Sequence, residues 1–149
     1  MRIPTADAMH ALGERIGTLV VPGAVIALQG DLGAGKSVLA RGIARGLGIA
    51  GRVPSPTFIL VAQYDQGRVP LFHADLYRLS DPDELENLGL DEMLGGDAVC
   101  VVEWAERFPE LLPVDTLTIR ITIDAEDVRH IQVDAGGPRA QAITEGLDG

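Results

Sequence analysis

Apolar residues recur along the chain with two spacings, which predict an alternation of helices and strands. Residues 5–19 and 39–47 carry apolar side chains three or four positions apart, which is typical of amphipathic helices. The runs at 25–28 and 98–102 are short and uniformly apolar, as strands buried on both faces are. These strands and helices alternate, which favours a parallel core.

Two further pairs of segments predict antiparallel hairpins. Residues 58–64 and 69–75 are predicted strands joined by a polar turn. Residues 117–123 alternate apolar with polar side chains, and 128–133 return after a polar loop. We therefore predict an α/β fold whose central mixed sheet has a parallel core, antiparallel additions and helices on both faces.

The length of 149 residues suits a single domain. We place this domain at 1–135 and expect 136–149 to be a flexible C-terminal tail, because glycine is frequent there and apolar residues are sparse. Asp81-Pro82-Asp83-Glu84 has the composition of a helix start, with an Asp cap followed by Pro.

A glycine-rich segment, GDLGAGKS, spans Gly30 to Ser37 directly after the first apolar run. It fits G-x-x-x-x-G-K-[ST], in which backbone N–H groups surround phosphates, Lys reaches the outer phosphates and Ser or Thr binds Mg²⁺. The flanking strand and helix supply the required context, and Lys36 is the only lysine in the chain. A glycine-rich turn with an incidental lysine is the alternative.

The second apolar run ends in an acid, within the sequence AVCVVEW. Glu103 would lie at the carboxyl end of a buried strand, where ligands of open α/β sheets bind and where P-loop proteins hold Mg²⁺. Alternatively, Glu103 marks the point where the strand meets water.

Two other segments carry polar side chains for which the sequence allows either a functional or a structural role. In FHADLYRL, His73, Asp75 and Tyr77 share one face of an extended backbone, although an ordinary hairpin end with a structural His73 and a surface Arg78 would look similar. In SPTF, Thr57 is either a turn residue or a hydroxyl brought to the terminal phosphate.

Composition narrows the possible partners. A net charge of −10 disfavours direct binding to nucleic acid. The single cysteine, Cys100, excludes a disulfide framework and suits a reducing compartment. No apolar run is long enough for a membrane span, and no export leader is expected.

GDLGAGKS, SPTF, HADLYRL and VVEW, in this order over residues 2–133, resemble the TsaE (YjeE) family. The resemblance implies a P-loop NTPase-like domain with ATP and Mg²⁺ as cofactors. It implies a slow ATPase that supports the TsaD and TsaB proteins in forming N6-threonylcarbamoyladenosine in tRNA (t6A at position 37 of tRNAs reading ANN codons). It further implies a cytoplasmic protein, monomeric or weakly oligomeric when alone, that meets tRNA only indirectly.

The same resemblance assigns roles to residues. Phosphates would be contacted by Gly33, Ala34, Gly35, Lys36, Ser37 and Val38. Ser37 and Glu103 would bind Mg²⁺, and Trp104 would pack beside Glu103 and fix its direction. Lys36, Asp75 and Thr57 would serve catalysis, with Asp75 orienting or deprotonating water or acting in the second metal shell, and Thr57 in a nucleotide-sensing loop.

The sequence departs from the family pattern at two places. The loop ends Lys36-Ser37-Val38, whereas the family usually has Lys-Thr-Thr, so the metal-binding hydroxyl is kept and the next one is lost. Met9 stands where the family often has Thr on the nucleotide side.

Two functions other than a slow ATPase are compatible with the sequence. A GTPase is disfavoured because no Asn-Lys-x-Asp element is present. A small-molecule kinase would need an acceptor pocket and a lid. A nucleotide-dependent regulatory switch with little turnover would suit the weak basicity of an isolated Asp75.

Overall fold

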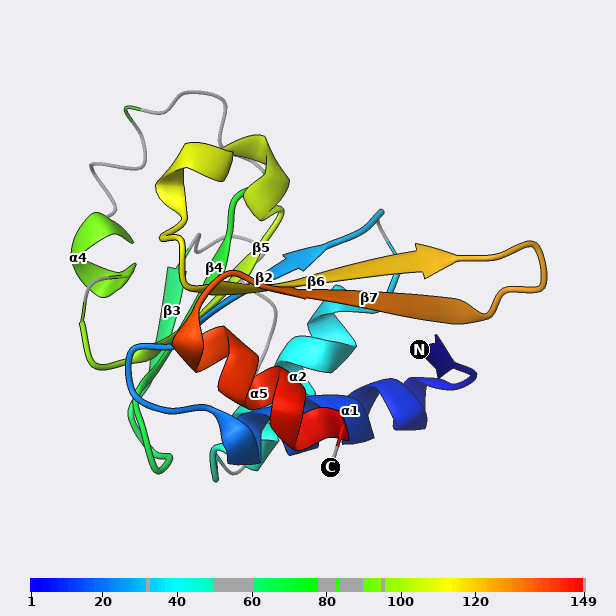
Figure 1. Cartoon of the computed structure of the whole chain (residues 1–149), viewed down its shortest axis with the longest axis horizontal. Coiled ribbons are helices and arrows are strands. Elements are labelled where there is room, and N and C mark those ends of the chain that lie inside the picture. The colour runs from blue at the N-terminus through cyan, green and yellow to red at the C-terminus, as the bar shows by residue number, and fades with distance from the viewer. Residues whose placement is uncertain (32, 50–60, 78–82, 84–89, 95, 149) are drawn as a thin grey trace.

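Figure 1 shows the chain as a computed structural model, which describes residues 1–31, 33–49, 61–77, 83, 90–94 and 96–148. Its centre is a seven-stranded sheet, in the order β1-β7-β6-β2-β5-β4-β3. The strands are β1 (Arg2–Ile3), β2 (Val25–Gln29), β3 (Val61–Tyr64), β4 (Leu71–Asp75), β5 (Val99–Glu103), β6 (Thr116–Ile123) and β7 (Arg129–Ala135). The helices are α1 (Ala6–Leu19), α2 (Lys36–Gly46), α4 (Leu90–Leu94) and α5 (Pro138–Asp148), with 3₁₀ turns η1 (Ala105–Arg107) and η2 (Pro109–Leu111).

The predicted mixed sheet is confirmed. Strands β4, β5, β2 and β6 run parallel to one another, whereas β3 pairs antiparallel with β4, β7 with β6 and β1 with β7. All residues of β5 and all but the last of β2 are buried, which explains why these two strands are uniformly apolar up to their polar ends. The predicted strand start at 58–60 and most of the predicted helix start at 81–84 lie outside the described residues.

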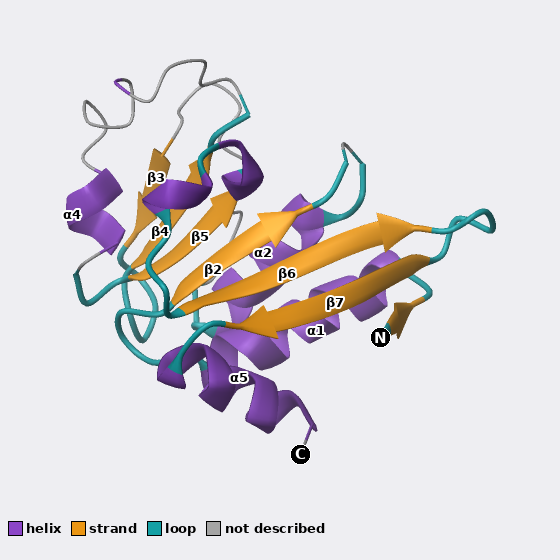
Figure 2. Cartoon of the chain, turned by 45° about the horizontal axis from the view of Figure 1, so that its top comes forward, coloured by secondary structure: helices purple, strands orange, loops and turns teal. Residues whose placement is uncertain are grey.

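Both faces of the sheet are covered, but unequally. The longer helices α1, α2 and α5 lie on one side, over the larger core (Figures 1 and 2). On the other side a smaller core, with Ala27, Ala74 and Val102 at its base, packs against residues of α4, η1 and η2. Within the described ranges, no helix has the length and apolar character needed to cross a membrane.

Helices α1 and α2 approach until their backbones touch. Gly13 faces Gly42 and Gly17 faces Gly46 across the contact. A Cβ at Gly42 would lie 2.3 Å from the carbonyl oxygen of His10, which only a backbone shift could relieve. Because α2 begins at the glycine-rich loop, this contact fixes the loop relative to the N-terminal helix.

The prediction of a flexible tail at 136–149 is wrong. Residues Pro138–Asp148 form α5, whose Ala140, Ile143 and Leu147 are buried in the larger core. The helix start is held from a distance, since the Asp115 carboxylate accepts hydrogen bonds from the backbone N–H groups of Arg139 and Ala140, each at 3.1 Å. The sequence near α5 shows neither this distant cap nor the core surface against which its three buried apolar residues pack.

Candidate functional site

The glycine-rich loop connects the carboxyl end of β2 to the first turn of α2. Because β2 lies between the parallel strands β5 and β6, the loop is next to their carboxyl ends as well. Gly35, which precedes α2, has φ of +114°, a conformation that side-chain-bearing residues rarely adopt. The loop therefore turns sharply enough to direct the free N–H groups of α2 into it.

Lys36 is buried within this loop. Its ammonium donates hydrogen bonds to the carbonyl oxygens of Gly30 and, at 2.9 Å, Asp31, and it lies 4.0 Å from the centre of the Trp104 ring. Burial lowers the pKa of Lys36, and the nearby carboxylates of Glu103, Glu106, Asp75 and Asp31 oppose this shift. The hydrogen bonds of the Lys36 ammonium go to neutral carbonyl oxygens. An anion bound in the loop would give this ammonium a direct ionic partner.

Ser37 and Glu103 meet at the start of α2. The Ser37 hydroxyl lies 3.4 Å from Oε1 of Glu103, whose side chain is buried at the end of β5. Hydroxyl and carboxylate oxygens are ligands that Mg²⁺ prefers, so these two residues fit the ion expected from the sequence. No group of three or more His, Cys, Asp or Glu side chains in the described residues could hold a metal alone. Phosphate oxygens and water would complete the coordination of Mg²⁺ here.

Strand β4 brings His73 and Asp75 to the same place. In the parallel register, His73 is opposite Val101 and Asp75 is opposite Glu103. The His73 Nε2 lies 2.5 Å from Oε2 of Glu103, and both side chains are buried. The predicted shared face is therefore present for these two residues.

Asp75 differs electrostatically from the isolated carboxylate considered from the sequence. Burial raises its pKa and the Glu103 charge adds to this, whereas the hydrogen bond that its Oδ1 accepts from the Tyr77 N–H at 2.9 Å and the nearby side chains of His73 and Lys36 oppose the shift. Asp75 is consequently a stronger base than an exposed aspartate.

Trp104 follows Glu103 directly and joins several of these residues. It has φ of +61°, which is uncommon for a bulky residue and indicates a constrained position. Its ring is 4.8 Å from the ring of Tyr77 and faces the Lys36 ammonium. Arg107 donates a hydrogen bond to the Tyr77 carbonyl oxygen, which ties η1 to the end of β4.

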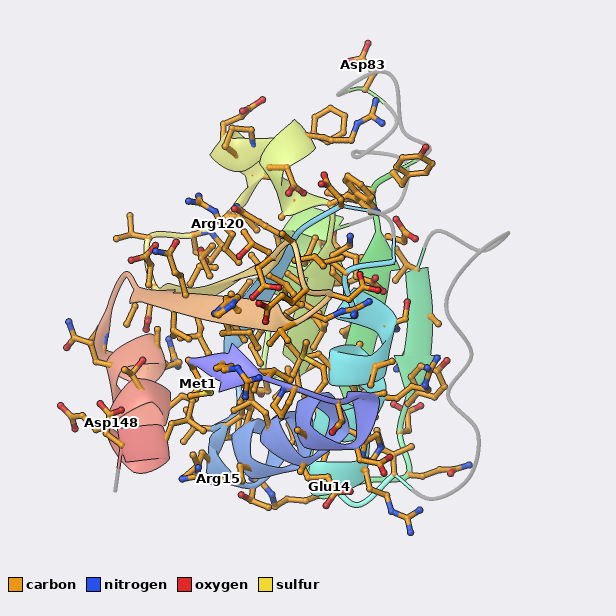
Figure 3. All side chains as sticks on the ribbon, turned by 90° about the vertical axis from the view of Figure 1, so that its right-hand side faces the viewer. Met1, Glu14, Arg15, Asp83, Arg120 and Asp148 are labelled. Carbon is orange, nitrogen blue, oxygen red and sulfur yellow. The ribbon has the colours of Figure 1, made fainter. Side chains whose placement is uncertain are left out.

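Two cavities flank the loop. One of about 220 Å³ is lined by Gly33 and Gly35 of the loop, by Val38 in the first turn of α2, by residues at the start of α1 including Met9, and by Arg129. The other, of about 510 Å³, is lined by Asp31, Trp104, Glu106 and residues of β6 including Arg120. Arg120 lies on the side of the sheet away from Glu14 and Arg15 of α1 (Figure 3).

The structure brings the predicted Lys36, Ser37, Asp75 and Glu103 together, whereas Thr57 and Arg78 lie outside the described residues. Sequence reasoning missed Arg129, whose Nη2 donates a hydrogen bond to the Gly33 carbonyl oxygen at 3.1 Å. It belongs to β7, 96 positions along the chain from Gly33, and no local signal marks it.

This fold, with a glycine-rich loop before α2 and an acid at the end of the adjacent strand, defines a P-loop NTPase-like protein. The sequence model of one family, described as "Threonylcarbamoyl adenosine biosynthesis protein TsaE", matches residues 3–131. The chain belongs to the TsaE family, and the resemblance found in the sequence is confirmed.

Named relatives agree with this assignment. The chain is 44% identical over 146 residues to a tRNA threonylcarbamoyladenosine biosynthesis protein TsaE of Bacillus subtilis, covering 98% of this chain and 91% of that protein. It is 36% identical over 138 residues to the protein of the same name from Haemophilus influenzae, covering 89% and 87%. A solved structure titled "Crystal structure of Bacillus subtilus YdiB" superimposes with a TM-score of 0.87 at 36% identity, covering 99% of this chain and 92% of that one.

Proposed function

We propose that this protein binds ATP with Mg²⁺ and hydrolyses it slowly, in support of the TsaD and TsaB proteins as they form threonylcarbamoyladenosine in tRNA. The observation that carries the proposal is the position of Lys36, buried in the loop at the start of α2 among carboxylates. Membership of a family named for threonylcarbamoyladenosine biosynthesis supplies the pathway.

The nucleotide would lie along the loop from one cavity to the other. Loop N–H groups from Gly33 to Val38 bind the phosphates, and Lys36 exchanges its contacts with Gly30 and Asp31 for the outer phosphates. We place the nucleoside in the cavity of about 220 Å³ beside Met9 and Arg129, which adjoins the loop glycines. Ser37 and Glu103 would hold the Mg²⁺, which would neutralise phosphate charge.

Asp75 is the residue we assign to water activation. Water attacks the terminal phosphorus, the bond from that phosphorus to the oxygen of ADP breaks, and Asp75 accepts the proton that the water loses. Its raised pKa favours this role, because burial makes the carboxylate more basic. Its position opposite Glu103 keeps it near the loop.

The kinase alternative is favoured by one observation. The cavity of about 510 Å³ lies against Asp31 and Trp104, where an acceptor could approach the terminal phosphate. Acceptor phosphorylation and water attack differ in product, so phosphate release separates them.

The test is ATP hydrolysis by the purified protein, alone and with TsaD and TsaB, with Lys36→Ala as control. We expect slow phosphate release that rises with the pair and is lost in Lys36→Ala, because the cation facing the phosphates is gone. Wild-type binding and turnover in Lys36→Ala would overturn the phosphate-binding role. Turnover that is indifferent to the pair would count against partner support, and screening small hydroxylated acceptors would follow.

A further inference from the structure

His73 and Glu103 form a buried pair whose purpose the sequence leaves open. The two residues are 2% and 3% exposed, and they come from adjacent parallel strands at the loop edge of the sheet. Within the described part of the chain, Nδ1 of His73 has no hydrogen-bond partner. The ring therefore makes one described polar contact, through Nε2 to Oε2 of Glu103 at 2.5 Å.

The direction of this hydrogen bond follows from the chemistry of the two groups. When the Glu103 carboxylate is ionised it can only accept hydrogen bonds, and Nε2–H of His73 is then the donor. The backbone of His73 is fixed on both sides, because β4 pairs it with Ala62 of β3 and with Val101 of β5. His73 is thus a rigid donor aimed at a single oxygen atom.

The consequence is that the two oxygens of Glu103 are not equivalent. Oε2 is occupied by His73, and Oε1 faces the Ser37 hydroxyl at 3.4 Å. Each carboxylate oxygen has two lone pairs, so the His73 hydrogen bond acts by fixing the rotation of the carboxylate, and Oε1 is the oxygen that Glu103 presents to a metal ion beside Ser37. Mg²⁺ uses one oxygen from a carboxylate and keeps several waters, whereas the larger Ca²⁺ takes six to eight oxygens and often both oxygens of one carboxylate.

We infer that His73 is a positioning residue which holds Glu103 for single-oxygen coordination and so makes the site select Mg²⁺ over Ca²⁺. This inference rests on the proposed function, because it concerns the ion bound with the nucleotide. Partners of metal-binding residues typically change metal affinity by about 10-fold to 100-fold when they are removed.

The experiment measures the affinity of the full-length protein for a non-hydrolysable ATP analogue by calorimetry, in Mg²⁺, in Ca²⁺ and without metal. The result of interest is the ratio of the two metal-dependent dissociation constants. In His73→Leu, which removes the donor, we expect the preference for Mg²⁺ over Ca²⁺ to fall about 10-fold, with little change in affinity without metal. His73→Gln, whose amide can donate to the same oxygen, should restore most of the preference.

Val101→Ala is the matched control, because Val101 is the fully buried neighbour opposite His73 and carries no polar group. It should lower stability and leave the metal preference unchanged. A preference in His73→Leu equal to wild type, or an equal loss in Val101→Ala, would overturn the inference. Combining His73→Leu with Glu103→Gln should add no further loss, since His73 acts through Glu103, and additive losses would contradict that.

A second measurement, on the wild-type protein, tests the inference even if His73→Leu does not fold. The chain has three histidines, so ¹⁵N NMR of the imidazole rings can be assigned by substitution. We expect His73 to be protonated at Nε2 in the wild-type protein, and protonation at Nδ1 instead would overturn the inference. If wild type binds no ATP analogue with Mg²⁺, the proposed function itself fails, which is a different outcome from an unchanged metal preference.

Discussion

At the scale of single residues, the site consists of charges held out of water beside the loop. Burial lowers the pKa of Lys36 and raises the pKa of Asp75, and both shifts disfavour the charged form of the group. Burial of these groups costs stability in the free protein, and a bound Mg²⁺–phosphate group would compensate for it. Functional groups held in this way often make a protein less stable than its fold allows.

Replacing Asp75 by Asn tests this trade-off. We expect hydrolysis to fall by about 10²-fold to 10⁴-fold, since the base is lost, while ATP binding persists. The free energy of unfolding should rise slightly at neutral pH. Because the folded pKa of Asp75 is raised, its unfavourable contribution develops as pH increases through that pKa, so the gain in Asp75→Asn should shrink in acid.

Phosphate release and urea unfolding at several pH values measure both effects. Asp134→Asn is the control, because Asp134 is exposed on β7 away from the loop. Normal hydrolysis in Asp75→Asn would mean that Asp75 is structural, and a loss of stability would contradict the role assigned to its burial.

At the scale of elements, the contact between α1 and α2 positions the loop. Gly42→Ala places a Cβ against the His10 carbonyl oxygen, so the helices must separate. We expect a loss of about 1–3 kcal/mol in the free energy of unfolding, despite the better helix propensity of alanine, together with weaker nucleotide binding.

Gly146→Ala in α5 is a matched control for Gly42→Ala, because its new Cβ meets only the flexible end of the Leu19 side chain. Thermal unfolding and calorimetric binding of the ATP analogue measure the two variants side by side. Equal effects in the two would mean that loss of glycine in a helix, and not backbone contact, is responsible.

The distant cap of α5 gives a second prediction at this scale. Asp115→Ala leaves the N–H groups of Arg139 and Ala140 without their acceptor, so we expect about 0.5–2 kcal/mol of destabilisation. Hydrogen exchange should quicken in α5 and remain slow in α2. Asp115→Asn should lose less, and unchanged exchange in α5 would show that its docked apolar face alone holds the helix.

The elements that the sequence predicts well are those whose signal is local. The uniform apolar runs of β2 and β5 and the loop motif between β2 and α2 each lie within a few consecutive residues. Helix α5 was missed because its cap is 24 positions away at Asp115. The pairing of His73 with Glu103 and the approach of Arg129 to Gly33 depend on strand order, which no local spacing contains.

At the scale of the whole molecule, the chain is acidic, and several of its arginine side chains form hydrogen bonds within the protein. Arg15 donates hydrogen bonds to carbonyl oxygens at the end of α5, and Arg68 does so at the end of α1. Arg107 and Arg129 donate to the carbonyl oxygens of Tyr77 and Gly33. These four cations are committed to backbone carbonyls and are poorly placed to form a surface for phosphates of RNA.

The consequence is a prediction about tRNA. With a net charge of −10, the purified protein should gain almost nothing from counterion release, so we expect no measurable affinity for tRNA at about 0.15 M salt. Fluorescence anisotropy of labelled tRNA measures this, with the TsaD and TsaB pair as the comparison. Lowering the salt strengthens binding in proteins that neutralise phosphates, whereas here the affinity should stay undetectable, because repulsion between the two acidic molecules grows as screening is removed. Tight binding with a steep salt dependence would show that the local arginines outweigh the net charge, and tRNA would then be a direct partner.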